Sequence, residues 1–387
     1  MSIKVEDYYA PATFQRMKAF ADQHETPFVV IDRQIIADAY DQLGTCFPFA
    51  KVYYAVKANP AVEIIELLRD KGSSFDIASI YELDKVMSRG VGPERISYGN
   101  TIKKSRDIRY FFEKGVRMFA TDSEADLRNI AKAAPGAKVY VRILTEGSTT
   151  ADWPLSRKFG CQTDMAMDLL ILARQLGLEP YGISFHVGSQ QRDISVWDAA
   201  IAKVKVIFER LKEEDGIELK MINMGGGFPA NYITRTNSLE TYAEEIIRFL
   251  KEDFGDDLPE IILEPGRSLI ANAGILVSEV VLVARKSRTA VERWVYVDVG
   301  KFSGLIETMD ESIKFPIYTE KKGEVEEVVI AGPTCDSADI MYENYKYGLP
   351  LNLAIGDRLY WLSTGAYTTS YSAVEFNGFP PLKAYYI

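Results

Sequence analysis

The sequence predicts a (β/α)8 barrel followed by a β-rich domain, and three observations support this architecture. Between about residues 50 and 267, eight short β-branched or aromatic runs alternate with longer amphipathic stretches. After Arg267 the sequence pattern changes to β-rich runs that are separated by glycine and by charged turns. The length of 387 residues is comfortable for two domains. We therefore place the barrel over 27–270 and the β domain over 271–387, together with 1–26.

The eight apolar runs are expected to form the strands of the barrel. They are VYYAV (52–56), FDIA (75–78), RISYG (95–99), RMFAT (117–121), KVYVRIL (138–144), YGISFHV (181–187), LKMINM (219–224) and EIILE (260–264). A doubly wound open sheet has the same alternation of strand and helix and is the structural alternative. The count of eight favours the barrel.

The stretches between these runs are expected to be helices. Apolar residues recur at three- and four-residue spacing in 61–70, and the stretch 79–90 ends in a glycine that suits a helix C-terminus. The stretch 122–134 opens with Asp-Ser and then Glu, a capping pattern. Longer helices are expected over 164–176, 196–214 and 239–252.

The C-terminal part is expected to be an antiparallel β domain. Its main runs are GILVSEVVLVARKS, RWVYVDVG, VEEVVIAGP and DRLYWLSTGAY, which have almost no helical periodicity. The segment before Pro27 fits neither pattern, and we expect it to pack on this β domain.

Composition excludes several classes of protein. The net charge of -10, from 45 basic and 55 acidic residues, argues against nucleic-acid binding, although an acidic surface can concentrate a cationic substrate. The N-terminus has no apolar signal core and no stretch reaches 18 apolar residues, so we expect neither export nor a membrane segment. Three widely spaced cysteines form neither a disulfide framework nor a zinc motif. We expect a cytoplasmic protein without a metal site.

Polar and charged residues gather where the predicted strands end. In a barrel of this kind, functional residues lie at the C-terminal ends of the strands. Those ends carry Lys57, Asp76, Asn100, Arg142, His186 to Ser189, Gly225 to Gly227 and Glu264 to Arg267. Ordinary loops would supply mainly glycine, asparagine and aspartate, whereas these strand ends also supply a lysine, a histidine, a glutamate and two arginines.

Two of these loops predict a phosphate site. Gly225, Gly226 and Gly227 follow the seventh strand, and their backbone N–H groups can surround an anion, although a plain tight turn would also explain them. Gly266 and Arg267 follow the eighth strand, and arginine binds phosphate with two parallel hydrogen bonds. The loops after strands seven and eight are the usual phosphate site of this fold.

Lys57 directly follows the first strand, which would direct its amine to the mouth of the barrel. A lysine in a partly dry site has a lowered pKa and can form a Schiff base. Together with a phosphate site it indicates pyridoxal phosphate. A Schiff-base aldolase that acts on a phosphorylated substrate fits the same two features.

The motifs YAVKANP, FDIAS, SFHVGS, GGGFP, EPGR and GPTCDSAD resemble, in family order, the fold-type III pyridoxal-phosphate decarboxylases. The ornithine/lysine decarboxylase branch is the nearest, and the resemblance covers residues 27 to 380. It implies an alanine racemase-like barrel with a C-terminal β domain, pyridoxal 5′-phosphate as cofactor, and a homodimer with shared active sites.

The resemblance also implies a role for each matching residue. Lys57 would hold the cofactor as a Schiff base, His186 would stack on the pyridine ring, and Glu264 would hold the pyridine nitrogen. The implied phosphate binders are Ser189, Gly225, Gly226, Gly227, Gly266, Arg267 and Tyr367. Asp76, Glu82 and Arg142 would be supporting polar residues around the cofactor.

The resemblance implies that Cys335 and Asp336 reach the site from the neighbouring subunit. Cys335 would protonate the carbanion, and Asp336 and Asp310 would meet the distal amine of the substrate. Lys158 and Asp339 resemble a pair that bridges the dimer interface. The residues themselves also allow simpler roles: Glu264 could pair with Arg267, His186 could be a satisfied core histidine, and Cys335 could be a small buried hydrophobe.

The implied reaction converts L-ornithine and/or L-lysine to putrescine or cadaverine in polyamine biosynthesis. Cys335-Asp336-Ser337 favours a cationic tail, since the diaminopimelate branch typically has Cys-Glu-Ser there. Met309 and Val299 depart from the pattern of the eukaryotic ornithine enzymes, which leaves ornithine and lysine both open. The biosynthetic arginine decarboxylases of this fold are expected to be much longer chains, which makes them a poor match.

Three other activities remain as alternatives. A diaminopimelate decarboxylase belongs to the same class. A racemase of the alanine type would have arginine where this chain has Glu264. A non-catalytic cofactor-binding homologue would tend to lose Lys57 or Cys335, which this chain keeps.

Overall fold

The computed structural model describes residues 3–145, 150–153 and 158–387, which divide into two compact units. We call them the barrel unit, with Ala37–Pro229 and Asn237–Gly266, and the β unit, with Met1–Ile36, Ala230–Thr236 and Arg267–Ile387.

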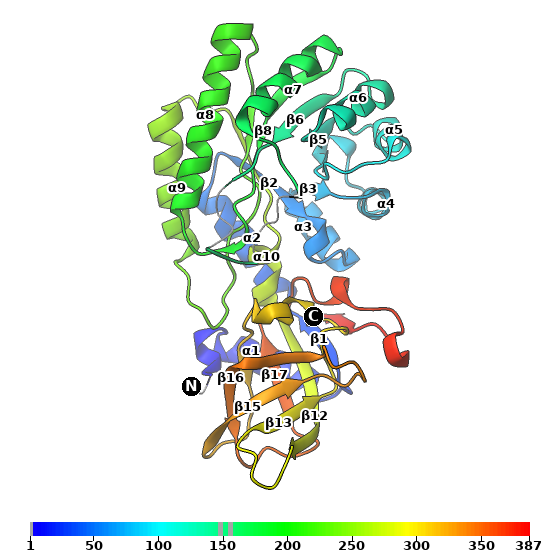
Figure 1. The fold of residues 1–387 in the computed structure, drawn as a ribbon, viewed down its shortest axis with the longest axis vertical. Helices are drawn as coiled ribbons and strands as arrows, with labels where there is room; N and C mark the ends of the chain where they lie inside the picture. Colours follow the sequence, from blue (N-terminus) through cyan, green and yellow to red (C-terminus); the bar gives the residue numbers. More distant parts are fainter. Residues whose placement is uncertain (1–2, 146–149, 154–157) are drawn as a thin grey trace. The chain divides into compact units, whose positions relative to one another are not determined.

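The barrel unit contains eight parallel strands that close on themselves (Figure 1). In order around the barrel they are β10 (Met221–Asn223), β11 (Glu260–Leu263), β2 (Ala50–Ala55), β3 (Ser74–Ile77), β4 (Ile96–Tyr98), β5 (Met118–Thr121), β6 (Lys138–Arg142) and β8 (Glu179–Ser184). Each coincides with one of the eight predicted strands to within a few residues. The closed barrel is therefore confirmed, and the open doubly wound sheet is excluded.

Helices surround these strands (Figure 1). They are α2 (Arg33–Cys46), α3 (Val62–Asp70), α4 (Ile80–Met87), α5 (Ser105–Glu113), α6 (Glu124–Ala133), α7 (Thr163–Gln175), α8 (Ser195–Asp215) and α9 (Leu239–Phe254). All six predicted helices are present, whereas α2 and α5 had not been predicted. Among the described residues, no helix is both long and apolar enough to span a bilayer.

Helix α4 begins at a reciprocal cap. The Ser79 hydroxyl accepts from the backbone N–H of Glu82 at 3.3 Å, and the Glu82 carboxylate accepts from the N–H of Ala78 at 2.8 Å. The cap predicted at α6 is different, because the Ser123 side chain makes no capping bond. Since an N-cap hydrogen bond is worth about 1 kcal/mol, we expect Ser79→Ala to lower the unfolding free energy in urea by that amount. Ser123→Ala is the matched control, and an equal loss in both variants would refute the assignment.

A buried ion pair joins Lys103, in the loop after β4, to Asp126, in the first turn of α6. The side chain of Lys103 is fully buried. Its Nζ donates to Asp126 at 2.7 Å and to the carbonyl oxygens of Asn100 and Ala120 at 3.0 and 2.6 Å. Thr121 donates a further hydrogen bond to Asp126 at 2.8 Å. Burial lowers the pKa of Lys103 and raises that of Asp126, and each partner opposes the shift of the other.

The β unit is built on an eight-stranded sheet. Its strands are β1 (Phe28–Ile31), β12 (Gly274–Arg285), β13 (Arg293–Val297), β14 (Ile317–Tyr318), β15 (Val325–Ala331), β16 (Ile340–Pro350), β17 (Arg358–Leu362) and β18 (Lys383–Tyr386). The sheet is mixed, because β13 pairs in parallel with β15 and β1 with β18. The prediction of a purely antiparallel domain is corrected on this point.

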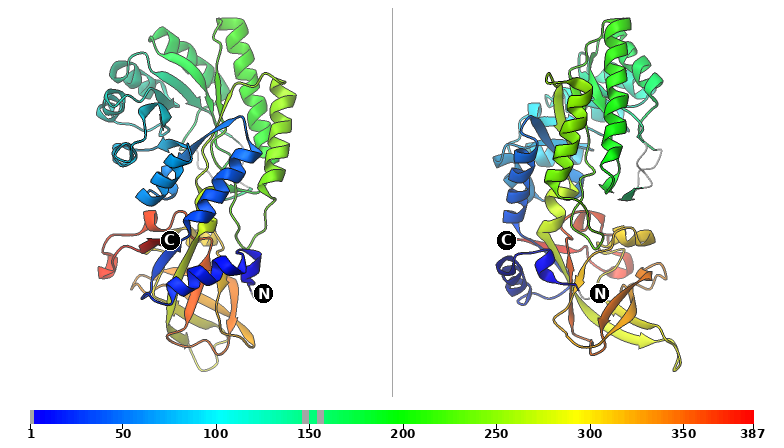
Figure 2. Two further views of the ribbon diagram at one scale, coloured as in Figure 1. Left: turned by 180° about the vertical axis from the view of Figure 1, so that it is seen from behind. Right: turned by 90° about the vertical axis from the view of Figure 1, so that its left-hand side faces the viewer.

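Helix α1 (Pro11–Ala21) covers this sheet, as Figure 2 shows. Its buried side chains Phe14 and Met17 pack with Phe28, Ile275 and Tyr360. The N-terminal segment therefore packs on the β unit, as expected.

The divisions between the units differ from the predicted boundaries at 27 and 270. Strand β1 belongs to the β unit because it pairs antiparallel with β12, with Phe28 opposite Val277. Residues Ala230–Thr236 also belong to the β unit, where the Tyr232 hydroxyl accepts a hydrogen bond from Arg267 at 2.9 Å. Neither contact leaves a signal in the local sequence pattern.

Candidate active site

Lys57 lies in a single 3-10 turn, Val56–Ala58, immediately after β2. Its side chain is exposed at the C-terminal end of the strand. Its positive charge opposes the rise in the pKa of Asp76 and of Glu82 and adds to the fall in the pKa of His186. These three groups come from different parts of the barrel. The amine therefore lies among the side chains with which the sequence grouped it.

The charge of this amine acts on two carboxyl groups, the buried one of Asp76 and the half-buried one of Glu82. Asp76 is in β3, is 8% exposed, and its Oδ1 has no hydrogen-bond partner among the described residues. Burial raises the pKa of Asp76 well above its usual range, and nearby Glu264 raises it further, whereas Lys57 opposes the shift. Burial also raises the pKa of Glu82. A Cβ at Gly99 would lie 1.9 Å from Asp76 Oδ1, so a glycine is needed there to admit the carboxylate.

Glu264 follows β11 and is held by Asn223 at the end of β10. Asn223 donates from Nδ2 to Glu264 Oε1 at 2.5 Å, and its Oδ1 accepts from the N–H of Gly225 at 2.9 Å. One amide thus connects the carboxylate to the glycine loop. The alternative pairing of Glu264 with Arg267 loses its support, because Arg267 forms its buried ion pair with Glu307. Sequence reasoning had missed Asn223, although a buried asparagine at a strand end was an available signal.

Arg142, at the end of β6, adds a cation to this group. Burial lowers its pKa, while the charges of Glu264 and Asp76 raise it. Its guanidinium also lies 5.1 Å from the ring of Phe159. The barrel mouth therefore contains Lys57 and Arg142 against the carboxyl groups of Asp76 and Glu264.

His186 is held as a neutral imidazole. Its Nδ1 accepts from the N–H of Gly188 at 3.0 Å, which places the ring proton on Nε2. Burial lowers the pKa of His186 well below its usual range, and the charges of Arg142 and Lys57 act in the same direction. A neutral ring fixed in this way can lie flat against an aromatic ligand.

This pKa shift predicts a pH-dependent contribution to stability. As the pH falls below about 6.5, the unfolded chain binds a proton at His186 before the folded chain does. In the cofactor-free chain, the stability advantage of wild type over His186→Phe should therefore shrink between pH 7 and pH 5.5, by up to about 1.4 kcal/mol per unit. Asp76, with its raised pKa, contributes with the opposite sign in both proteins. Urea unfolding at each pH tests this, and a constant difference would contradict a buried neutral imidazole.

The glycine loop is packed too closely for any side chain. A Cβ at Gly225 would lie 2.4 Å from the carbonyl oxygen of Phe185, and one at Gly226 would lie 2.6 Å from that of Glu264. At Gly227 it would lie 2.7 Å from the oxygen of Gly188. Gly225 and Gly227 also have positive φ angles of 65° and 102°. The loop therefore presents bare backbone beside His186.

Ser189 lies in β9 (Ser189–Gln191), which pairs antiparallel with β7 (Ala151–Trp153). Gly266 ends the barrel unit, and Arg267 begins the short helix α10 (Arg267–Ile270) of the β unit. Arg267 is buried and forms a bidentate ion pair with Glu307. Tyr367, also in the β unit, has its ring 4.8 Å from the Arg267 guanidinium.

The residues assigned to the distal amine and to proton transfer lie on the surface of the β unit. Asp310 is exposed, with a φ of 51°, in the 3-10 segment Ile306–Glu311. Cys335 and Asp336 are also exposed, and the N–H of Cys335 donates to Asn377 at 2.9 Å. Their exposure excludes the simpler role of Cys335 as a buried hydrophobe.

Asp339 shapes the loop that carries Cys335. It is 2% exposed and accepts from the N–H of Lys301 at 2.8 Å and from the hydroxyl of Thr334 at 2.7 Å. Lys158 is exposed in the barrel unit. Their pairing across a dimer interface stays a prediction.

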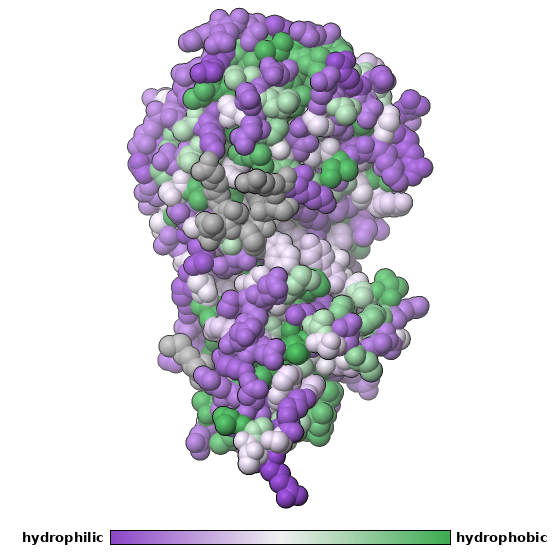
Figure 3. All heavy atoms as spheres, viewed as in Figure 1, coloured by the Kyte–Doolittle hydropathy of each residue, from purple (hydrophilic) through white to green (hydrophobic). Residues whose placement is uncertain are grey.

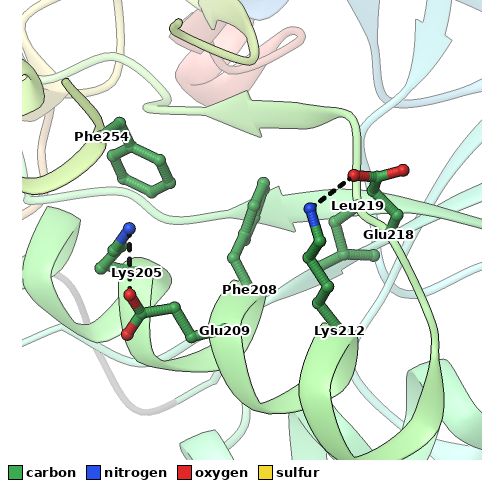
Figure 4. Close-up of a pocket in the computed structure, with 7 residues that line it drawn as sticks. All are labelled: Lys205, Phe208, Glu209, Lys212, Glu218, Leu219 and Phe254. Atoms are coloured by element: carbon green, nitrogen blue, oxygen red, sulfur yellow. Dashed lines mark hydrogen bonds and ion pairs between the residues drawn. The ribbon is translucent and has the colours of Figure 1, made fainter. Parts of the chain in front are cut away.

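A pocket lies beside the N-terminal end of β10, away from these residues (Figure 4). Phe208 and Phe254 meet edge to face there, at 5.5 Å between ring centroids. Its lysines are paired with neighbouring glutamates, Lys205 with Glu209 at 3.1 Å and Lys212 with Glu218 at 2.8 Å. This pocket lacks the residues that a cofactor site needs.

The residues at the barrel mouth fit pyridoxal phosphate. The glycine loop presents backbone without side chains beside His186, the neutral imidazole suits a flat aromatic ring, and the charge of Lys57 acts on the nearby carboxyl of Asp76. Asp76 Oδ1, which has no partner among the described residues, is a further polar group that a ligand can satisfy.

Comparison with known proteins identifies the family. The model of the pyridoxal-dependent decarboxylase pyridoxal-binding domain matches residues 33–271. The lysine/ornithine decarboxylase of Selenomonas ruminantium is 33% identical over 94% of this chain and 90% of its own. A crystal structure of the lysine decarboxylase of that organism with PLP and cadaverine has a TM-score of 0.87 and 30% identity, and covers 100% of this chain and 95% of that one.

An arginine decarboxylase matches equally well. The crystal structure of the Paramecium bursaria Chlorella virus enzyme has a TM-score of 0.87 and 29% identity, and covers 97% of this chain and 100% of that one. The expected greater length of the biosynthetic arginine decarboxylases therefore does not extend to this viral enzyme, which the match covers completely. The family model, the relatives and the fold agree. The chain therefore belongs to the fold-type III pyridoxal-dependent decarboxylases, in the ornithine/lysine decarboxylase branch, with pyridoxal 5′-phosphate as cofactor.

Proposed function

We propose that this chain decarboxylates L-ornithine and L-lysine to putrescine and cadaverine, with the cofactor carried on Lys57. The observation that carries the proposal is the position of the Lys57 amine among Asp76, Glu82 and a neutral His186, in a chain of this family. The Selenomonas relative is named for both lysine and ornithine, and a related structure contains cadaverine.

Pyridoxal phosphate, when bound, supplies an acceptor for the electron pair that remains when the substrate carboxylate leaves. Glu264, which Asn223 holds in place, would keep a proton on the pyridine nitrogen. His186 would support the face of the ring. The phosphate would be bound by Ser189, by the loop Gly225–Gly227, and by Gly266, Arg267 and Tyr367.

Cys335 would deliver the proton that replaces the lost carboxylate. Its thiol and the neighbouring Asp336 are exposed on the β unit, on a loop held by Asp339 and Asn377. An exposed thiol has no structural role to explain it, and we propose that it works in the site of a second copy of the chain.

A homodimer is supported by the surface around this loop. The nearby segment 371–379 carries exposed Tyr371, Val374, Phe376 and Phe379, and green hydrophobic side chains are visible there in Figure 3. Such a cluster on the surface is typical of a contact with another protein chain. We also propose a reducing, cytoplasmic setting, because all three cysteines are free.

The substrate's distal amine would meet the carboxylates of Asp310 and Asp336. A cationic tail gains from two acidic partners, whereas the distal carboxylate of diaminopimelate would be repelled by them. One methylene separates ornithine from lysine and is worth about 1–3 kcal/mol in a fitted pocket. We therefore expect measurable activity on both.

Initial rates of CO2 release test the assignment, with ornithine, lysine, arginine and meso-diaminopimelate compared at saturating cofactor. We expect kcat/KM for ornithine or lysine to exceed that for diaminopimelate by at least about 100-fold. Arginine belongs in the comparison because the viral arginine decarboxylase matches 97% of this chain. Highest activity on diaminopimelate would overturn the proposed substrate, and no release of CO2 from any of the four would favour a non-catalytic homologue.

A further inference from the structure

The guanidinium of Arg267 is held by a carboxylate that the sequence did not single out. Glu307 lies in the 3-10 segment Ile306–Glu311 and is 2% exposed. Its Oε1 accepts from NH2 of Arg267 at 2.6 Å and its Oε2 from NH1 at 2.7 Å. Both side chains are 3% exposed, so this end-on, two-bond pair is almost fully removed from water.

Two tyrosines fix the same guanidinium from other directions. The hydroxyl of Tyr232 accepts a second hydrogen bond from NH1 at 2.9 Å, and the ring of Tyr367 lies 4.8 Å from Cζ. Tyr232 is itself buried against Phe315, with the two rings edge to face at 5.5 Å. Arg267 is therefore constrained by a carboxylate, a hydroxyl and an aromatic face.

The pair balances the charge of Arg267 and fixes the direction of its guanidinium. A lone cation at this depth would be costly, and removing one partner of a buried pair leaves the other charge uncompensated. The net charge of Arg267 with Glu307 is zero. The pair therefore fixes the direction of the guanidinium, and its value for binding a phosphate depends on orientation more than on net charge.

We propose that Glu307 is a positioning residue for the cofactor, which holds Arg267 in the orientation that binds the phosphate group. This inference rests on the proposed role of Arg267 as a phosphate binder. Glu307 would act on the phosphate alone, because its contacts are to Arg267 and not to the residues assigned to the pyridine ring.

Comparing two forms of the cofactor isolates this effect. Dissociation constants for pyridoxal phosphate and for pyridoxal, which lacks the phosphate, are measured with the cofactor-stripped full-length chain. For Glu307→Gln we expect the affinity for pyridoxal phosphate to fall about 10- to 100-fold, as for other residues that orient a ligand-binding side chain. The affinity for pyridoxal should stay within about twofold. Glu307→Asp, which keeps the charge, should recover part of the loss.

Glu311→Gln is the matched control from the same 3-10 segment. The Glu311 carboxylate accepts from the N–H groups of Glu343 and Asn344, both at 2.7 Å, and of Tyr345 at 2.8 Å, so its loss disturbs the segment without altering the partner of Arg267. We expect the ratio of the two affinities to stay at the wild-type value. The 31P resonance of the bound cofactor should move in Glu307→Gln and stay in Glu311→Gln.

The outcomes separate this inference from the proposed function. If Glu307→Gln binds pyridoxal phosphate as tightly as wild type, or if it loses affinity for both forms equally, Glu307 does not position the phosphate binder. If Arg267→Ala also leaves the preference for the phosphorylated form unchanged, the phosphate assignment of Arg267 fails together with the inference. If wild type binds neither form, the cofactor site itself is wrong.

Discussion

Lys57→Ala should remove the visible absorbance of the bound cofactor and lower turnover by about 10⁴-fold or more, the scale seen when a covalent catalytic residue is lost. The reason is chemical, because Lys57 is the amine whose charge acts on all three of Asp76, Glu82 and His186 in the part of the chain that the structure describes, whereas Lys85 acts on Glu82 alone. Spectrophotometric titration with pyridoxal phosphate and single-turnover CO2 release measure the two effects.

Lys51→Ala is the matched control for this prediction. Lys51 belongs to the same strand, β2, but its side chain is 60% exposed and pairs with Glu260 at 3.1 Å. Its replacement should leave both absorbance and turnover unchanged. Full activity without Lys57, or an equal loss in the two variants, would remove Lys57 from the mechanism.

Cys335→Ala should keep the cofactor and the fold but slow product formation by about 10²- to 10⁴-fold, the usual contribution of a positioned proton donor. The thiol is exposed, and the bond that holds its loop comes from the backbone N–H to Asn377, so alanine disturbs no packing. Pre-steady-state rates of product release, with cofactor absorbance as the measure of loading, test both parts. Cys46→Ala, at a half-buried cysteine in α2, should change neither.

Mixing two inactive variants tests where Cys335 acts. If Lys57 of one copy works with Cys335 of the other, a heterodimer of Lys57→Ala and Cys335→Ala contains one intact site. Random exchange of subunits should then restore about a quarter of wild-type activity. No restoration would place both residues in the same copy or remove Cys335 from the reaction.

The barrel was predictable from the sequence because its strands are buried on both faces. Continuous apolar runs such as Phe28–Ile31 and Met118–Thr121 mark strands equally well, but they do not tell which sheet each one joins. Strand β1 pairs with β12 and β18, both far away along the chain, and therefore belongs to the β unit instead of the predicted barrel domain. Helix α5 was missed because its buried face consists of only Ile108 and Phe111.

The chemistry of the candidate site was predictable where residues follow strand ends, as Lys57 and Glu264 do. What could not be predicted is how distant side chains satisfy each other. Asn223 meets Glu264 across 41 positions, and Glu307 meets Arg267 across 40. Neither partnership has a local pattern, because burial and not spacing selects the partner. The capping pattern at Ser123 failed for the same reason, since Asp126 in that turn bonds with Lys103.

The Lys103 ion pair has a consequence for how the barrel mouth receives a ligand. Asn100, whose carbonyl accepts from Lys103, donates from its side chain to the carbonyl of Ala78, and the N–H of Ala78 donates to Glu82. These bonds form a continuous chain of hydrogen bonds that connects the C-terminal ends of β3, β4 and β5. The carboxylate of Glu82 accepts the last of these bonds, so this acidic group is already in place before any ligand arrives, and little energy is spent on rearranging it.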